Sequence, residues 1–208
     1  MKLTKFLLIT AAVLLGFSVA VSSCQGEAKY IGMWQGNPEH LVSVPGANDA
    51  TITVTLDFSP NAEQRGTGII TLNATIEATQ SVTNVMTSLD QAYEANIAAT
   101  ASIIGNYVRA DDDDDDVLVT FNPTSMQLNV DPAGVTFSNN ILTGVPEPML
   151  DSLSQATAAH WKTALLPAVR EVFNRYRKID DIKVHHGDMM SCELADRDYT
   201  FRRVGVPD

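Results

Sequence analysis

The strongest constraint on the fold is an alternation of apolar and polar residues, with a period of two, that recurs along most of the chain. In residues 51–58 the apolar side chains occupy every second position, namely Ile52, Val54, Leu56 and Phe58. Threonines and an aspartate occupy the other positions. Because successive side chains of a strand point to opposite faces, this pattern predicts an antiparallel strand with one buried and one solvated face.

Similar segments predict further strands. Residues 70–77 repeat the alternation after a turn-rich connection and predict the hairpin partner of the first strand. The other predicted strands are residues 104–109, 117–121, 126–130, 135–137, 182–186, 189–194 and 199–204. Residues 80–101 are ambiguous, because their alanines favour a helix, whereas the alternation from Tyr93 to Ala101 favours the strand that we predict.

Residues 147–178 differ, because their apolar side chains recur at helical spacing. Pro148 suits a first helical turn, and Arg175 and Lys178 suit the last turn, next to the negative end of the helix dipole. Pro167 lies inside the pattern and predicts either a kink or two abutting helices. We therefore predict a mainly β chain, an antiparallel barrel or β-sandwich with one long helix packed before the last two strands.

Composition limits the classes of function. The chain has 208 residues, of which 45% are hydrophobic and 19% are charged, and this is typical of one globular domain. A net charge of -11 argues against nucleic acid as a partner, because phosphate binding needs clustered Lys and Arg. No phosphate-binding loop, zinc-protease, nucleophile-elbow or CxxC motif is present. We expect neither a cofactor nor catalysis.

The N-terminal residues have a different character. Lys2 and Lys5 precede an apolar stretch from Phe6 to Val21, which is shorter than a membrane-spanning helix requires and is typical of a secretory signal peptide. Ser22-Ser23-Cys24 then resembles the lipobox of bacterial lipoproteins. This resemblance implies cleavage before Cys24 and acylation of its thiol. An ordinary signal peptide with an incidental cysteine, or an uncleaved anchor, is the alternative.

We therefore expect a signal peptide at residues 1–23 that is removed, a lipidated Cys24 with a tether to residue 29, and a single domain over residues 30–208. Acyl chains on Cys24 hold such a domain at a membrane without any segment that crosses it. Cys192 is then left without a disulfide partner, and its alternating apolar surroundings predict a small buried hydrophobe.

Three segments of the chain together resemble the lipocalin-like (calycin-like) lipoproteins of Bacteroidetes cell envelopes. They are Gly32-Met33-Trp34, Ile104-Gly105-Asn106-Tyr107 and Tyr199-Thr200-Phe201-Arg202-Arg203. The resemblance implies a lipocalin-like barrel with Trp34 at its closed end and an arginine of the last strand, Arg202 or Arg203, across the indole. The predicted helix departs from that family's layout, because the lipocalin helix follows all eight strands.

Eight apolar residues of the predicted strands are candidates for the lining of a ligand cavity. They are Ile52, Val54, Phe58, Leu72, Tyr107, Phe121, Met190 and Phe201. A closely packed core predicts the same pattern, so the sequence leaves both interpretations open.

The acidic run from Asp111 to Asp116 is the most conspicuous polar segment. Asp111, Asp113 and Asp115 have the spacing of the first ligands of a calcium loop, but the glycine and glutamate that complete such a loop are missing. Mutual repulsion among six carboxylates favours a solvated hairpin tip instead of a metal site. His185 and His186 are neighbours on a predicted strand, so they point to opposite faces and do not share an ion.

These observations predict an outer-membrane lipoprotein that binds a small apolar or amphipathic ligand without catalysis. The alternative is a structural or interaction lipoprotein, an accessory subunit or inhibitor of another envelope protein, that uses its outer surface and has no ligand cavity. In the Bacteroidetes lipoproteins that the chain resembles, an acidic sequence after the lipidated cysteine directs the protein to the cell surface. Residues 25–29 carry one acid and one base, so the resemblance implies the periplasmic face of the membrane. Loss of Lys2 and Lys5 with the signal peptide changes the net charge from -11 to -13.

Overall fold

The computed structural model describes residues 29–83, 92–110, 115–138 and 146–205. Its strands are β1 (Gly32–Gly36), β2 (Glu39–His40), β3 (Asp49–Pro60), β4 (Thr67–Thr83), β5 (Ala92–Arg109), β6 (Val117–Phe121), β7 (Gln127–Ser138), β8 (Lys178–His185), β9 (Met189–Glu193) and β10 (Asp198–Arg203). A short 3-10 helix, η1 (Pro123–Ser125), precedes β7, and the α-helix α2 (Glu147–Arg175) precedes β8. The predicted signal peptide and Cys24 lie outside the described residues.

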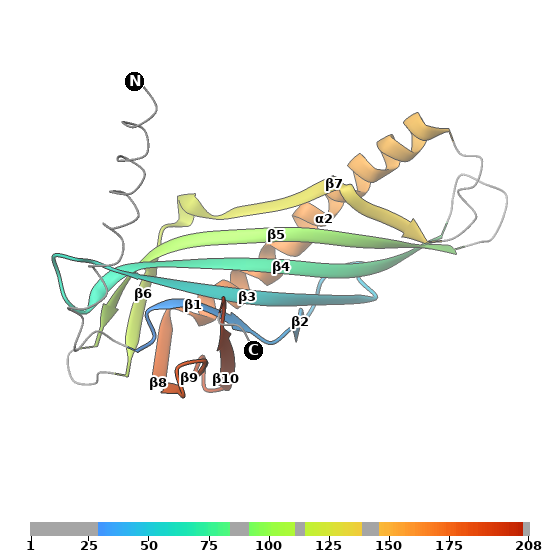
Figure 1. Cartoon of the computed structure of the whole chain (residues 1–208). Coiled ribbons are helices and arrows are strands. Elements are labelled where there is room, and N and C mark those ends of the chain that lie inside the picture. The colour runs from blue at the N-terminus through green and yellow to red at the C-terminus, as the bar shows by residue number, and fades with distance from the viewer. Residues whose placement is uncertain (1–28, 84–91, 111–114, 139–145, 206–208) are drawn as a thin grey trace, which may run out of the picture.

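The strands form an antiparallel ring. β1 pairs with β10 on one side and with β3 on the other, so the order β1-β10-β9-β8-β6-β5-β4-β3 returns to β1. β2 lies beside β3, and β7 pairs with β5 (Figure 1). The predicted mainly β fold is confirmed, and of the two predicted architectures the chain adopts the barrel.

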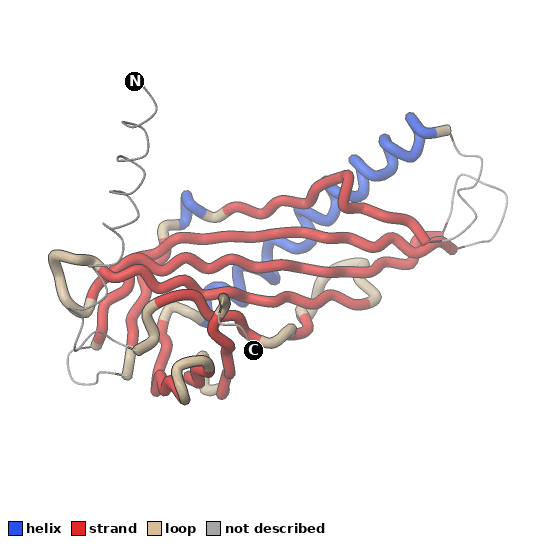
Figure 2. Tube along the Cα trace, in the orientation of Figure 1, coloured by secondary structure: helices blue, strands red, loops and turns tan. Residues whose placement is uncertain are grey.

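The strands β3, β4 and β5 extend beyond the ring and form a long sheet with β7 (Figure 2). β4 and β5, with 17 and 18 residues, pair along nearly their whole length. On the other side of β5, β6 pairs with residues 105–109 and β7 pairs with residues 94–102. The described parts of the ambiguous segment 80–101 are strand, which confirms the prediction made for it.

The helix α2 crosses one face of this long sheet (Figures 1 and 2). Small side chains are frequent on the buried face of the strands, at Ala50, Ala74, Ala78, Ala95, Ala99 and Ala101. They leave room for the helix backbone to approach the sheet. The residues that α2 buries are Ala158, Trp161, Leu165, Ala168, Val169, Val172 and Phe173.

The observed helix differs from the prediction at its end. It is one helix with Pro167 inside it, so of the two predicted alternatives the break into two helices does not occur. It ends at Arg175 and not at Lys178, because Lys178 already pairs with Leu118 as the first residue of β8. Three strands follow the helix, as the predicted segments 182–186, 189–194 and 199–204 require, and not the two of the predicted architecture.

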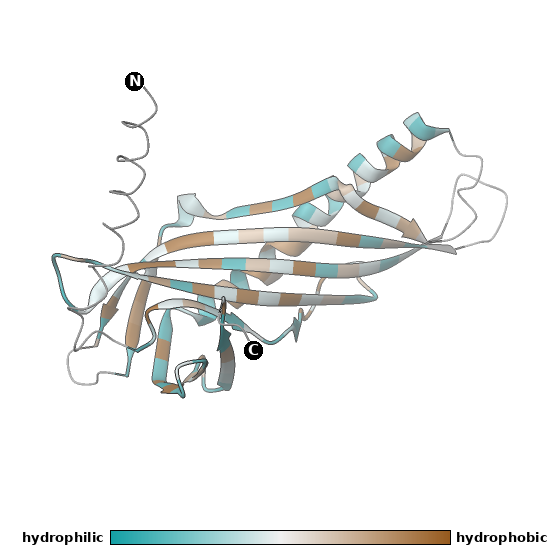
Figure 3. Ribbon diagram, in the orientation of Figure 1, coloured by the Kyte–Doolittle hydropathy of each residue, from teal (hydrophilic) through white to brown (hydrophobic). Residues whose placement is uncertain are grey.

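A single hydrophobic core joins the barrel to the space under α2. The inward-facing residues of the strands and the buried residues of the helix belong to one contiguous cluster. Figure 3 shows the alternation along the strands that produces this core. Among the described residues no charged side chain is buried, so the core is stabilised by apolar burial and close packing.

Replacement of Gly68 by alanine should destabilise the barrel. A Cβ atom at Gly68 would overlap the carbonyl oxygen of Ser59 and would lie 2.6 Å from the Tyr107 ring, so the backbone or the ring must move. We expect Gly68→Ala to lower the free energy of unfolding by about 1 to 3 kcal/mol, measured by urea denaturation.

Gly134→Ala is the matched control, because Gly134 also lies in a strand. A Cβ atom there would lie 3.4 Å from its nearest neighbour, the carbonyl oxygen of Asp131, which is an ordinary contact. The control should change stability by less than about 0.5 kcal/mol. Equal losses in the two variants would contradict the close approach at Gly68.

Candidate functional site

The eight candidates for a cavity lining all lie in the core. Leu72 and Met190 expose 0% of their surface, and Phe121, the most exposed of the eight, exposes 9%. A side chain that faces a ligand-sized cavity keeps surface that water can reach, whereas a closely packed side chain does not. The structure therefore places all eight residues in packed positions, namely Ile52, Val54, Phe58, Leu72, Tyr107, Phe121, Met190 and Phe201.

The helix α2 and the residue after it supply part of this packing. Phe173 and Tyr176 expose 1% and 2% of their surfaces. The ring of Tyr176 lies 6.5 Å from that of Phe201 on β10, centroid to centroid. Burial raises the pKa of Tyr176 well above its usual value, so its hydroxyl stays neutral. The end of α2 thus packs against the barrel wall as core.

Arg203 packs over Trp34 at one end of the barrel. The two residues are cross-strand neighbours on β10 and β1, and the guanidinium carbon lies 4.6 Å from the indole centroid. The Arg203 Nη2 atom also donates hydrogen bonds to the carbonyl oxygens of Lys29 and Ile31, at 3.1 and 3.5 Å. Arg202 is exposed. Of the two arginines expected to meet Trp34, Arg203 is the one that does.

Aromatic rings pack together at the same end. The ring of Tyr30 lies 5.1 Å from that of Phe58 and 6.3 Å from that of Tyr107, centroid to centroid. The Trp34 indole donates a hydrogen bond of 2.7 Å to the Tyr30 carbonyl. Burial, with a smaller contribution from Tyr107, raises the pKa of Tyr30 to about 12. This end of the barrel is an aromatic cluster with the Arg203 cation packed over Trp34.

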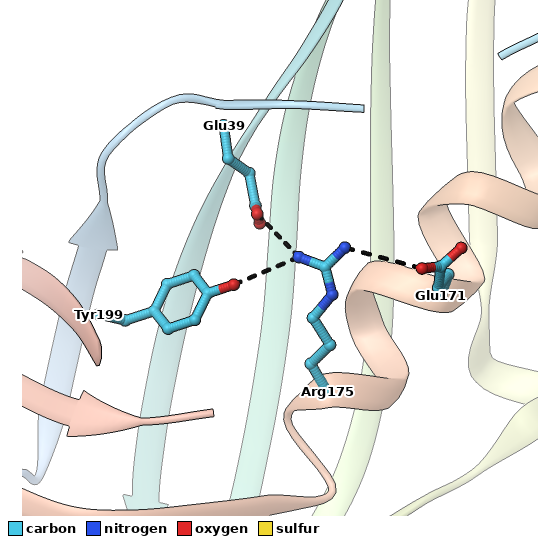
Figure 4. A network of polar contacts seen from close by, with 4 residues as sticks. All are labelled: Glu39, Glu171, Arg175 and Tyr199. Atoms are coloured by element: carbon cyan, nitrogen blue, oxygen red, sulfur yellow. Dashed lines mark hydrogen bonds and ion pairs between the residues drawn. The ribbon is translucent and has the colours of Figure 1, made fainter. Parts of the chain in front are cut away.

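Arg175, the last residue of α2, joins three elements in a polar network (Figure 4). Its Nη1 atom donates hydrogen bonds to the Glu39 carboxylate at 2.8 Å and to the Tyr199 hydroxyl at 3.3 Å. Its Nη2 atom lies 3.9 Å from the Glu171 carboxylate. Because Glu39 belongs to β2 and Tyr199 to β10, the network ties the end of the helix to both strands.

The pKa of Arg175 fits a structural role. Burial alone would lower its pKa, but the hydrogen bond with Tyr199 and the charge of Glu39 outweigh burial and raise the pKa. The guanidinium therefore stays charged, and it is engaged by the partners that surround it. We interpret this network as a clamp on α2 and not as a reactive centre.

Cys192 is buried and free, as the sequence predicts. Burial, with a smaller contribution from the charge of Asp180, raises the pKa of its thiol to about 12. The thiolate is the reactive form of cysteine, so this thiol is inert near neutral pH.

The histidines are dispersed over the described residues. His40 lies on β2, and its Nδ1 atom is 3.0 Å from the Asp49 carboxylate. The Nε2 atom of His185 is 3.1 Å from the Ser191 hydroxyl, and His160 is exposed. Among the residues that the structure describes, no three His, Cys, Asp or Glu side chains are grouped to hold a metal ion.

The described end of the acidic run contacts β8. The Asp115 carbonyl accepts a hydrogen bond of 2.9 Å from the Ile182 amide, and the Asp116 carboxylate accepts one of 3.0 Å from the Asp181 amide. Asp111 and Asp113 lie outside the described residues. The last two aspartates therefore help to join β6 to β8, where the ladder between these strands is short.

The outer surface of the barrel carries an apolar patch on β4, β5 and β6. Four side chains there expose 45 to 51% of their surfaces, namely Ile69, Ile104, Val108 and Leu118. Val108 and Leu118 are cross-strand partners. The patch is shallow, and polar positions such as Asn106 interrupt it.

A groove of about 760 Å³ lies between β7 and α2. Residues between Pro123 and Asn129 form one wall, and Lys162, Leu166 and Arg170 of α2 form the other. We call it the β7–α2 groove. Sequence analysis missed it, because its walls are far apart in the chain and meet only in the fold. The pattern that could have indicated it is Leu166, which lies four positions from both Lys162 and Arg170 and therefore shares a helix face with them.

No helix of the described residues combines the length and the apolar character needed to cross a membrane. No family model matches the chain, and no curated protein matches its sequence. The proposals below therefore depend on the structure and the sequence themselves.

Loss of Arg203 should destabilise the closed end of the barrel. Arg203→Met keeps an apolar stem over Trp34 but removes the cation and its hydrogen bonds to Lys29 and Ile31. We expect the free energy of unfolding to fall by about 1 to 3 kcal/mol in urea denaturation. Arg202→Met, at the exposed neighbouring position, should change it by less than about 0.5 kcal/mol. Equal effects at the two positions would contradict a special role for Arg203.

Proposed function

We propose that this chain is a non-catalytic lipoprotein of the bacterial cell envelope that binds another protein through its outer surface. The observation that supports the proposal is the near-complete burial of the inward-facing side chains, in one core that the barrel shares with the buried face of α2. A barrel that carries a small ligand needs an unfilled space of roughly 300 Å³ or more. The packed positions of the candidate cavity residues favour the surface as the place of binding.

Entry of a small ligand between α2 and the strands would require α2 to move away. This movement would expose Trp161 and Phe173, and it would break the ion pair of Arg175 with Glu39. Burial of one large apolar side chain contributes about 1.5 to 3 kcal/mol, and α2 buries several. Micromolar binding of a ligand contributes only about 8 kcal/mol. The loss of apolar burial therefore outweighs the free energy of binding, and displacement of the helix is unfavourable.

We also propose membership of the lipocalin-like lipoproteins. The closed ring of strands and the cation of Arg203 over Trp34 support this family, because the resemblance implies both. The position of α2 before β8 departs from the family's layout. A shared fold does not fix a function, so a barrel of this kind with a packed core is free to act through its surface.

The membrane attachment completes the proposal. Acylated Cys24 would anchor the chain in the outer membrane, on its periplasmic face. Lys29 lies five positions after Cys24, and an extended chain of this length spans at most about 18 Å. Because the Lys29 carbonyl bonds to Arg203, the end of the barrel with the aromatic cluster would face the membrane.

Acylation of Cys24 is the first test. Cells that express the tagged full chain and are fed an alkyne fatty acid should incorporate the label into the wild type and into Cys192→Ser. Cys24→Ser should carry none, because the acceptor thiol is gone. The readout is in-gel fluorescence after the label is coupled to a dye. Labelling of Cys24→Ser would contradict the proposal that the chain is a lipoprotein acylated at Cys24.

The second test separates the two modes of binding. We expect native mass spectrometry of the chain, released from its own membrane in mild detergent, to give the mass of the acylated chain without a further small molecule. A polypeptide should be present in the same complex. A stoichiometric small molecule retained by the chain would contradict the packed core and favour the cavity function.

A further inference from the structure

We infer that the β7–α2 groove binds an extended acidic segment of a partner protein, which adds to the free edge of β7. This inference deepens the proposed function and rests on it, because it names the part of the outer surface that binds and the chemistry of the partner.

The first support is the free edge of β7. One side of β7 pairs with β5, from Ser102 opposite Gln127 to Glu94 opposite Ser138. In the described part of the chain no second strand pairs with β7. A free edge offers N–H and C=O groups to an added strand. Pro132 has no N–H group, so the stretch from Gln127 to Val130 is the part best suited to pairing.

The second support is the charge on the opposite wall of the groove. Lys162 and Arg170 are both exposed on α2, and no described carboxylate forms an ion pair with either. Two unpaired cations that border one groove are notable in a chain whose net charge is -11. Acidic side chains on an incoming segment would complement them.

The third support is the apolar surface between the cations. Leu166 lies on the helix between Lys162 and Arg170 and Met126 lies on the facing wall, and both are partly exposed. This surface favours a segment with an apolar side chain over a bare anion such as phosphate, which would leave these residues uncovered.

Spacing sharpens the expected segment. Lys162 and Arg170 are eight residues apart, which is a rise of about 12 Å along the helix. The first and fifth residues of an extended chain are about 13 Å apart, and the first, third and fifth side chains share one face. The matching segment therefore carries two acids four positions apart and an apolar residue midway between them.

The chain holds this spacing in residues 147–151, as Glu147, Met149 and Asp151, but there it belongs to the helix α2 and not to an extended strand. It recurs in residues 90–94, whose described part, residues 92–94, is already paired within β5. In a second copy, the β7 strand holds a single carboxylate, Asp131. The acidic run 111–116 contains no apolar residue to cover Leu166. The fitting occupant is accordingly a different protein.

Two synthetic peptides and the acylated full chain in detergent provide the test. One peptide has ten residues, with glutamates four positions apart and a leucine midway, and the other has lysines in place of the glutamates. We expect saturable binding of the acidic peptide in calorimetry, weakened by added salt, and at least tenfold weaker binding of the basic one. No binding of the acidic peptide, or equal binding of both, would overturn the inference.

Charge reversal in the groove locates the binding. Lys162→Glu with Arg170→Glu should weaken the acidic peptide about tenfold or more. Arg197→Glu with Arg202→Glu changes the net charge equally at exposed positions elsewhere and should leave the affinity within about twofold. Equal losses in the two double variants would mean that net charge, and not the groove, attracts the peptide, which overturns the inference.

The same variants distinguish failure of this inference from failure of the proposed function. If a polypeptide from the native membrane stays bound to the groove variant, the chain acts through its surface but not through this groove. If the chain instead retains a small molecule in its barrel, the proposed function itself fails. Dimerisation of the wild type that the groove variant abolishes would assign the edge to a second copy and overturn the inference.

Discussion

The apolar inner face of the long strands is the constraint on which the rest of this structure depends. β4 and β5 continue far beyond the positions at which they join the ring, and their buried face continues with them. An apolar sheet face of this length must be covered by another element. The helix α2 covers it, and the alanines at positions such as 74 and 101 allow the close approach.

The element that covers the long sheet lies between the sheet and the last strands in the chain. The helix α2 follows β7 and precedes β8, β9 and β10. Arg175 then fixes the end of the helix to β2 and β10 through Glu39 and Tyr199. The position of the helix, the closing strands of the ring and the Arg175 network are thus all connected to the covering of the long sheet.

Much of the fold can be predicted from local sequence patterns, and the rest depends on contacts between distant segments. The alternation from Ile52 to Phe58 identifies a strand, because the period of two is a local property. The contact of an arginine in residues 202–203 with Trp34 could be expected from a family resemblance. The ring closure through β1 and the β7–α2 groove could not, because each brings together segments remote in the sequence. The end of the helix was misjudged, since Lys178 fits a last helical turn as well as a first strand residue.

The position of α2 connects the packed core with the free edge of β7. β6 and β7 lie end to end beside β5, and η1 joins them where the Ser125 hydroxyl accepts a hydrogen bond of 2.9 Å from the Ile104 amide. β6 continues into the ring through β8, whereas β7 follows the long sheet away from it. The helix packs beside β7, and no described strand pairs with the second edge of β7. The same helix that covers the long sheet therefore places Lys162 and Arg170 beside that free edge.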